Sequence, residues 1–259
     1  KYEYTIEHRQ SYTISAVTYP IPQNDLTQKI YDARDGSLLK TGNPYTLDVI
    51  KSERERIDSE LKDKGYVYFS PDFIMMRADS TTGDHQVRIA VSIKPETPLE
   101  SRTPFTIRNV YVHDDNLLEA SEQDTFTYGG FYLITRQNTI DFSALQPGIF
   151  LKPGELYSRS NYLHTVRYLS DLPIIRNVNI KFLPIAGTNQ LDVIIFMTQR
   201  KRFAYTAEFN TVIRSTNYFG PGAIFSYTDR NASRGADLLK LNLRGSFEMQ
   251  IVDGHINPA

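Results

Sequence analysis

The chain has 259 residues and a formal net charge of -1, which is enough length for about two domains. The balanced charge argues against a nucleic-acid surface, and the absence of Cys excludes disulfides, thiolate nucleophiles and cysteine metal sites. The longest apolar run, Val193–Met197, is far shorter than the roughly 20 residues of a membrane-spanning helix. A membrane-spanning strand needs only about ten residues of alternating character, so that option stays open.

The chain starts without an initiator Met or a signal-peptide core, so we expect a mature segment or a piece of a longer protein. The alternating stretch Lys1–His8 predicts a lone strand, similar to the last strand of a preceding repeat. The next strand is predicted at Ser11–Tyr19, where apolar and polar residues alternate again.

One phrase occurs twice, as LKTGNPYT at Leu39–Thr46 and as LKPGELYS at Leu151–Ser158. Its glycine predicts a tight turn with positive φ, and its closing Thr or Ser predicts a helix N-cap. The Tyr before each cap can form a hydrophobic staple with the residue four positions into the helix, Ile50 or Tyr162. The phrase therefore predicts the entry to a helix in two copies of one unit.

The first of these helices is predicted to end at Gly65, and the second before Pro173. The buried stripes are expected to hold Leu47, Ile50, Ile57 and Leu61 in the first helix, and Tyr162, Val166 and Leu169 in the second. The other faces of the first helix are expected to carry Glu53, Arg54, Glu55, Arg56, Glu60 and Lys62.

Strands are predicted after both helices. They are Tyr66–Phe69, Phe73–Arg77 and Gln86–Ile93 in the first copy, and Asn177–Phe182 and Gln190–Met197 in the second. The second copy starts with the strand Pro104–Val112 and carries an inserted hairpin at Thr125–Ile134, turned by Gly129-Gly130. We therefore expect four segments: the end of a preceding repeat at 1–9, repeats at 10–98 and 103–198, and further strands at 203–259, with the repeats in a rigid array.

The last segment has no helical pattern. It predicts strands at Phe203–Asn210, Ala223–Thr228 and Leu238–Gly245, the last with Leu on one face and Lys, Asn and Arg on the other. A membrane barrel needs this contrast, and a soluble sheet with one solvated face gives it too. The basic run Gln199–Arg202 fits either lipid headgroups or a solvated linker.

No catalytic constellation is present. The five His residues lack metal-ligand spacing, and no phosphate loop or nucleophile motif occurs. His113-Asp114-Asp115 is the most suggestive cluster, but a loop at the end of a strand explains it; His164 is expected to be packed or solvated. We expect no enzyme activity, no metal and no cofactor.

Three stretches carry a family resemblance: Tyr157–Phe182, Leu191–Met197 and Gly222–Gly245, the last containing "DRN", a Gly and an alternating strand. Together they resemble the BamA/TamA superfamily of outer-membrane assembly proteins, in which periplasmic POTRA modules precede a β-barrel. The phrase and SERERIDSELKDKGYVYF (Ser52–Phe69) look most like the lipoprotein-type, TamA-like branch. Ala232-Ser233 departs from the pattern, since bulkier apolar residues are expected before the Gly.

The resemblance implies an α+β fold: tandem POTRA modules, each β-α-α-β-β with a mixed three-stranded sheet, followed by antiparallel strands that begin a transmembrane barrel. It implies a protein of the bacterial outer membrane, with its modules in the periplasm, that helps to insert or translocate other proteins. The implied partners are unfolded or nascent outer-membrane or secreted proteins, accessory assembly subunits and outer-membrane lipid, without nucleic acid. The alternatives are a soluble structural or adhesive repeat protein and the POTRA region of a two-partner secretion transporter.

In this interpretation the site is exposed backbone, which binds client strands by β-augmentation. The client-pairing edge is predicted at Asn177, Val178, Asn179, Ile180, Lys181 and Phe182. A weaker candidate edge is Phe73–Arg77. The edge of the first barrel strand is predicted at Tyr205, Thr206, Ala207, Glu208 and Phe209.

Overall fold

The computed structural model describes residues 11–81, 83–113, 124–135, 140–214, 218–247, 249–252 and 255–258. The predicted strand at Lys1–His8 and the pair Asp114-Asp115 lie outside these ranges. The chain forms two compact units. The first holds Lys1–Asn109, Leu151–Leu163 and Leu183–Asp192, and the second holds Val110–Phe150, His164–Phe182 and Val193–Ala259.

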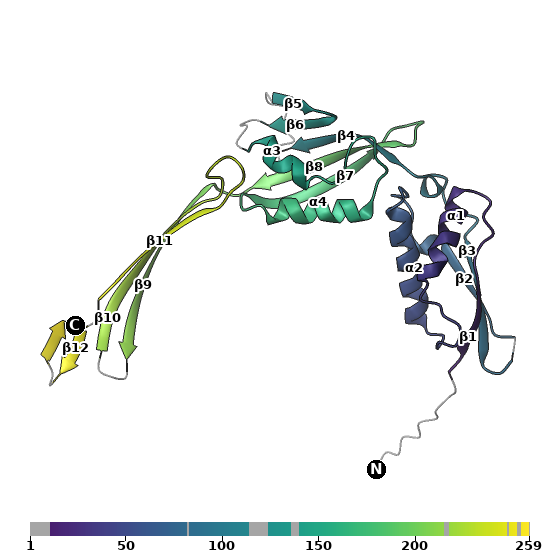
Figure 1. The fold of residues 1–259 in the computed structure, drawn as a ribbon, viewed down its shortest axis with the longest axis horizontal. Coiled ribbons are helices and arrows are strands. Elements are labelled where there is room, and N and C mark those ends of the chain that lie inside the picture. Colours follow the sequence, from purple (N-terminus) through teal and green to yellow (C-terminus); the bar gives the residue numbers. More distant parts are fainter. Residues whose placement is uncertain are drawn as a thin grey trace, which may run out of the picture. The chain divides into compact units, whose positions relative to one another are not determined.

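The first sheet (Figure 1) contains β1 (Thr13–Thr18), β2 (Ile74–Asp79) and β3 (Gln86–Ile93) in the order β1-β3-β2. β1 runs parallel to β3, and β2 runs antiparallel to it. Helices α1 (Asp25–Asp32) and α2 (Leu47–Lys62) contribute to one buried core with this sheet. The core includes Ile14, Leu26, Ile30, Ile50, Ile57, Leu61, Ile74, Val87, Ile89 and Val91.

Both ends of α2 follow local rules. Thr46 Oγ1 accepts a hydrogen bond from Val49 N at 3.3 Å, as predicted for an N-cap, and Gly65 adopts φ +100° just beyond the helix. Leu47 was predicted to belong to the buried stripe of α2, and this prediction is wrong, because its side chain is 65% exposed. It occupies the first helical position, where the chain enters the helix and no described element covers it.

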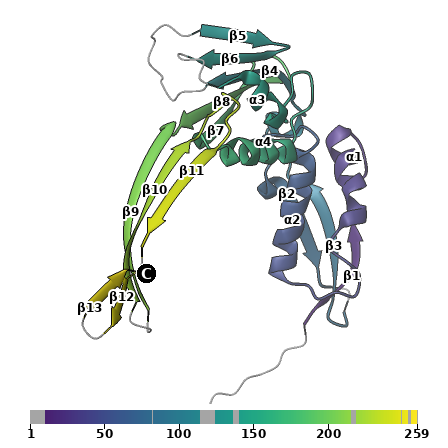
Figure 2. The same cartoon turned by 60° about the vertical axis from the view of Figure 1, so that its left-hand side comes forward.

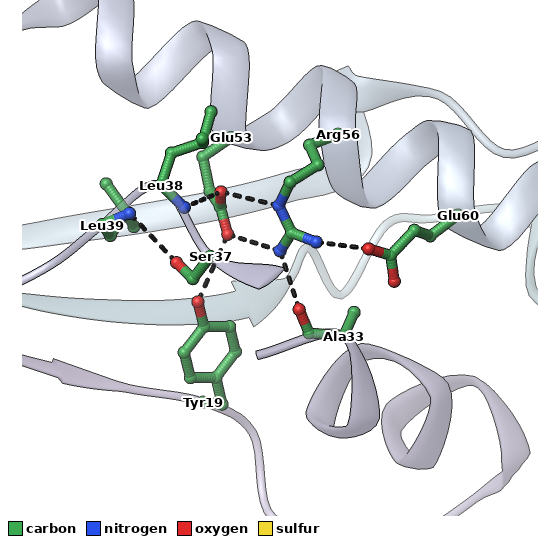
Figure 3. Close-up of polar contacts among 8 residues, drawn as sticks. All are labelled: Tyr19, Ala33, Ser37, Leu38, Leu39, Glu53, Arg56 and Glu60. Carbon is green, nitrogen blue, oxygen red and sulfur yellow. Dashed lines mark hydrogen bonds and ion pairs between the residues drawn. The ribbon is translucent and has the colours of Figure 1, made fainter. Parts of the chain in front are cut away.

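The largest correction concerns Glu53, which was expected on a solvated face but is 0% exposed. Figure 3 shows its carboxylate accepting hydrogen bonds from Leu38 N at 2.9 Å, Tyr19 Oη at 3.3 Å and the guanidinium of Arg56 at 2.7 and 2.9 Å. Arg56 also donates to Ala33 O at 2.9 Å and to Glu60 at 2.5 Å. The segment between α1 and α2 folds over this face of α2. The hydrogen bonds from Leu38 N to Glu53 and from Arg56 to Ala33 O hold it there.

The predicted strand Tyr66–Phe69 is also wrong, since these residues form turns after α2. Their apolar character serves burial instead: Tyr66 is 0% and Phe69 is 2% exposed. The Tyr66 hydroxyl donates to Asp25 Oδ2 at 2.5 Å. Burial, with the neighbouring Asp25 carboxylate, raises the pKa of Tyr66.

The second sheet contains β4 (Thr106–His113), β5 (Asp124–Tyr128), β6 (Phe131–Thr135), β7 (Ile175–Pro184) and β8 (Gln190–Gln199). Its order is β5-β6-β4-β8-β7, so that β4-β8-β7 repeats the order β1-β3-β2. The predicted hairpin is present as β5 and β6, and β6 pairs in parallel with β4. Helices α3 (Phe142–Leu145) and α4 (Arg159–Asp171) belong to this second copy.

The repeated phrase does more than start a helix, because it also pairs with the first strand of its own copy. In the first copy, Ile14 N donates to Asn43 O, Gly42 N donates to Ile14 O, and Tyr45 N donates to Tyr12 O. In the second copy the equivalent bonds join Ile107 N to Glu155 O, Gly154 N to Ile107 O, and Tyr157 N to Phe105 O. All six distances lie between 2.7 and 3.0 Å. The two copies therefore share one backbone scaffold around the phrase.

The third sheet contains β9 (Phe203–Arg214), β10 (Tyr218–Asp229), β11 (Leu239–Ser246), β12 (Met249–Val252) and β13 (His255–Pro258). Its described pairs are all antiparallel, and β10 lies between β9 and β11, as Figures 1 and 2 show. Among the helices in the described ranges, none has the length and apolarity to cross a membrane.

Candidate functional site

The predicted client-pairing residues lie in β7, which is one of the two outermost strands of the second sheet. Asn177, Asn179 and Lys181 are exposed, and Ile180 is 9% exposed. Side chains therefore alternate between solvent and core through this part of β7. Within the described residues, no strand pairs with the outer side of β7, so a row of backbone donors and acceptors faces outward there.

The opposite side of the second sheet is extended by the hairpin. β6 covers the edge of β4 that would correspond to the outer edge of β1 in the first copy. The outermost strand on that side is β5, which is mostly exposed. Of the three strands that repeat the first copy, β7 alone keeps an outer edge in the described part of the chain.

The weaker candidate, Phe73–Arg77, falls largely within β2, which is also outermost in its sheet. β2 is short, and its last three residues are exposed. Short, polar edge strands bind other strands poorly. The first sheet thus places this candidate on an edge but gives it fewer backbone groups than β7.

The second predicted edge lies in β9. This strand pairs with β10 along its full length, from Phe203↔Asp229 to Arg214↔Tyr218. Tyr205, Thr206, Ala207, Glu208 and Phe209 are all exposed, and no described strand pairs with the other side of β9. The structure places both main predicted edges at the outside of a sheet.

The sheet of β9, β10 and β11 separates apolar from polar side chains. Cross-strand register aligns Tyr205 with Tyr227 and Leu241, and Ala207 with Phe225 and Leu243, on one face. The opposite face aligns Thr206 with Ser226 and Asn242, and Glu208 with Ile224 and Arg244. The apolar face is open: Phe209 is 87%, Leu243 71% and Tyr205 68% exposed. An exposed apolar surface of this kind marks a membrane or protein contact.

The "DRN" stretch orders the turn between β10 and β11. Asp229 accepts a bidentate pair of hydrogen bonds from Arg202, at 2.9 and 3.0 Å, and accepts another from Asn231 N at 3.0 Å. Asn231 Oδ1 in turn accepts from Ala236 N at 3.0 Å. The last residue of the basic run is thus held by an ion pair, and the choice between headgroup contact and linker concerns Arg200 and Lys201.

No metal-binding group of His, Asp and Glu side chains occurs among the residues that the structure describes. His113 stacks on Phe196, with ring centroids 5.0 Å apart, and burial lowers its pKa. Burial therefore favours the neutral form of His113, which serves as a packed ring. His164 is exposed and lies 5.6 Å from the Phe150 ring.

No family model and no curated protein matches the chain, but solved structures do. BamA from Haemophilus ducreyi lacking POTRA domains 1–3 matches 94% of this chain at 14% identity, with a TM-score of 0.51. POTRA domains 3–5 of Haemophilus influenzae BamA match 72% of the chain at 14% identity, and CdiB from Acinetobacter baumannii 95% at 12%, with TM-scores of 0.47 and 0.43. These matches cover 44%, 61% and 40% of the respective structures.

The chain therefore spans less than half of the Haemophilus ducreyi structure, 44% of its length. At this identity the match shows the fold. The predicted fold class is confirmed. The fold is mixed α+β, with POTRA-like sheets and helices followed by antiparallel strands that match the start of the barrel in the Haemophilus ducreyi structure.

Proposed function

We propose that this chain is the POTRA region and first barrel strands of an outer-membrane protein assembly or translocation factor. Its repeats would lie in the periplasm and β9–β11 in the bacterial outer membrane. The observation that carries the proposal is the open apolar face of β9–β11, in which Tyr205, Phe225, Leu241 and Leu243 share one side. Strands of a membrane barrel place apolar side chains outward and polar ones inward.

Client binding follows from the open edge of β7. An unfolded outer-membrane protein is rich in alternating strands, and it can pair its backbone with β7 without a specific side-chain sequence. The exposed residues Asn177, Asn179 and Lys181 leave room for varied client side chains. β9 offers a second edge, to which a client strand can pass at the membrane.

The role requires no chemical step and no cofactor. It implies unfolded or nascent outer-membrane or secreted proteins as clients, outer-membrane lipid around the barrel, and accessory assembly subunits. Within this class we favour a TamA-like role, on the resemblance of the phrase and of Ser52–Phe69.

Replacing Val178 with proline is expected to weaken client binding about five- to tenfold. Proline removes one backbone donor and its ring obstructs strand pairing, and a lost hydrogen bond costs about 1 kcal/mol. Val178 is half-buried, whereas Ile180 is buried, so a substitution at Val178 disturbs the core less than one at Ile180. The measurement is photo-crosslinking to a porin-derived peptide with an alternating sequence, using Val178→Thr as the matched control that keeps the N–H.

Circular dichroism must first show that both variants keep the fold of the parent, since an edge strand tolerates proline where the N–H faces away from the neighbouring strand. If a folded Val178→Pro variant crosslinks as efficiently as Val178→Thr, the client does not pair with this edge.

A further inference from the structure

The two copies differ sharply in exposure at equivalent positions around the phrase. Tyr12 is 42% exposed, whereas its counterpart Phe105 is 4% exposed. Tyr45 is 36% exposed, whereas its counterpart Tyr157 is 5% exposed. Because the backbone scaffold is the same in both copies, this difference comes from what covers the surface. We call the positions Tyr12, Tyr45, Leu47 and Asp48 the junction surface of the first copy.

In the second copy the equivalent surface is covered by the turn that follows α2, within the same compact unit. Phe105 N donates to Gly65 O at 2.9 Å, and the rings of Tyr68 and Phe105 meet edge to face with centroids 5.2 Å apart. The approach is close: a Cβ at Gly65 would lie 3.0 Å from Pro104 Cβ. This turn buries Phe105 as completely as a residue of the hydrophobic core.

Polar contacts complete the cover. The Asp63 carboxylate accepts hydrogen bonds from Ser160 N at 2.7 Å, Ser160 Oγ at 2.8 Å and Ser158 Oγ at 2.9 Å. Burial opposes ionisation of Asp63, but the hydrogen bonds from Ser160 and Ser158 outweigh it and lower its pKa. Asp58 adds an ion pair to Arg159 at 3.3 Å. The end of α2 therefore caps the N-terminus of α4, where a negative charge is favourable.

We propose that the junction surface of the first copy is the docking site for the same part, the turn after the long helix, of a further repeat that precedes it in the complete protein. The inference rests on the comparison of the two copies and does not depend on the membrane role. Leu47 is 65% exposed, and with Tyr12 and Tyr45 it presents an apolar surface of the kind that Phe105 and Tyr157 bury. Such a surface is stabilised by burial at about 25 cal/mol per Å².

The sequence at the junction surface specifies the chemistry of the partner. The counterpart of Arg159 is Leu47, and the counterpart of Ser160 is Asp48. A docking repeat would therefore carry an apolar residue where the first copy has Asp58, and a cation or an amide donor where it has Asp63. A second copy of this chain is disfavoured, because it would bring Asp63 against Asp48.

Cysteine labelling tests this directly, because the chain contains no native Cys. Leu47→Cys is introduced into both the 259-residue chain and the product of the complete gene, and its rate of reaction with a maleimide is measured. We expect labelling at least about tenfold slower in the complete protein. Ile21→Cys is the control, since Ile21 is 78% exposed and lies off the junction surface; it should react equally in both proteins.

Three results would overturn the proposal: equal rates for Leu47→Cys in both proteins, slow labelling already in the 259-residue chain at low concentration, or a complete gene without an upstream repeat. Slowing of the 259-residue chain only at high concentration would identify a second copy as the occupant and also contradict the proposal. Adding Asp48→Lys is expected to restore fast labelling in the complete protein. Asp48→Lys also changes the reactivity of the nearby thiol directly. The labelling rate of the same double variant in the 259-residue chain measures that direct effect and corrects for it.

Discussion

Replacing Glu53 with alanine is expected to lower the free energy of unfolding by about 3 kcal/mol, because it removes one partner of a buried ion pair and leaves Glu60 as the remaining carboxylate beside Arg56. Glu53 is fully buried, and four hydrogen bonds end on its carboxylate (Figure 3). Without it, Leu38 N and one side of the Arg56 guanidinium lose their acceptor. Urea denaturation followed by circular dichroism measures the change.

Glu55→Ala is the matched control, since Glu55 is exposed on the same helix and should change stability by no more than about 0.5 kcal/mol. A Glu53→Ala variant as stable as Glu55→Ala would contradict the assignment of the buried pair.

The effect of Glu53→Ala should depend on pH. Burial opposes ionisation of Glu53, but its hydrogen bonds from Arg56 and Leu38 outweigh this and lower its pKa below the ordinary value. A carboxylate with a lowered pKa in the folded state stabilises it fully above the unfolded pKa and loses that contribution as pH falls through the folded pKa. The difference between parent and variant should therefore be largest near neutral pH and shrink below about pH 4.

Replacing Leu243 with arginine is expected to disfavour membrane insertion of the complete protein by about 2–4 kcal/mol, the cost of a cation on the lipid face of a membrane barrel. Leu243 is 71% exposed on the apolar face, in register with Phe225. Insertion is measured as the fraction of refolded protein that resists protease in lipid vesicles. The matched control is Asn242→Arg, one residue away on the polar face, and it should insert almost as well as the parent.

Equal insertion of the two arginine variants would contradict a lipid-facing role for this surface. It would instead favour a soluble sheet whose apolar face meets another protein.

The strands were the best-predicted part of the fold. The predicted Gln86–Ile93 has the same bounds as β3, and the inserted hairpin and the three strands predicted after Phe203 were also found, because alternation with a period of two is a strong local signal. The short strands β12 and β13 were not predicted. The two edges were predicted from the resemblance to POTRA modules and to the first strand of the barrel, and β7 and β9 lie on the outside of their sheets.

The errors share a physical cause, which is burial by segments distant in the sequence. Glu53 follows a charged helical pattern, and only the folded segment around Leu38 makes it a core residue. Tyr66–Phe69 has strand-like composition, but its rings are buried in turns. The local sequence did not predict that the phrase pairs with the first strand of its own copy, because the phrase was recognised only as a repeated helix entry. The difference between the junction surface of the first copy and its counterpart in the second copy appears only when the exposed fractions of equivalent side chains are compared.

The most direct measurement for client capture is backbone amide hydrogen exchange in the presence and absence of an unfolded porin peptide. The account predicts that the peptide slows exchange in β7, Ile175–Pro184, and leaves β3 unchanged, because β3 is paired on both sides in the first sheet. Protection that avoids β7, or that spreads equally over both sheets, would contradict the proposed pairing of client strands with the edge of β7.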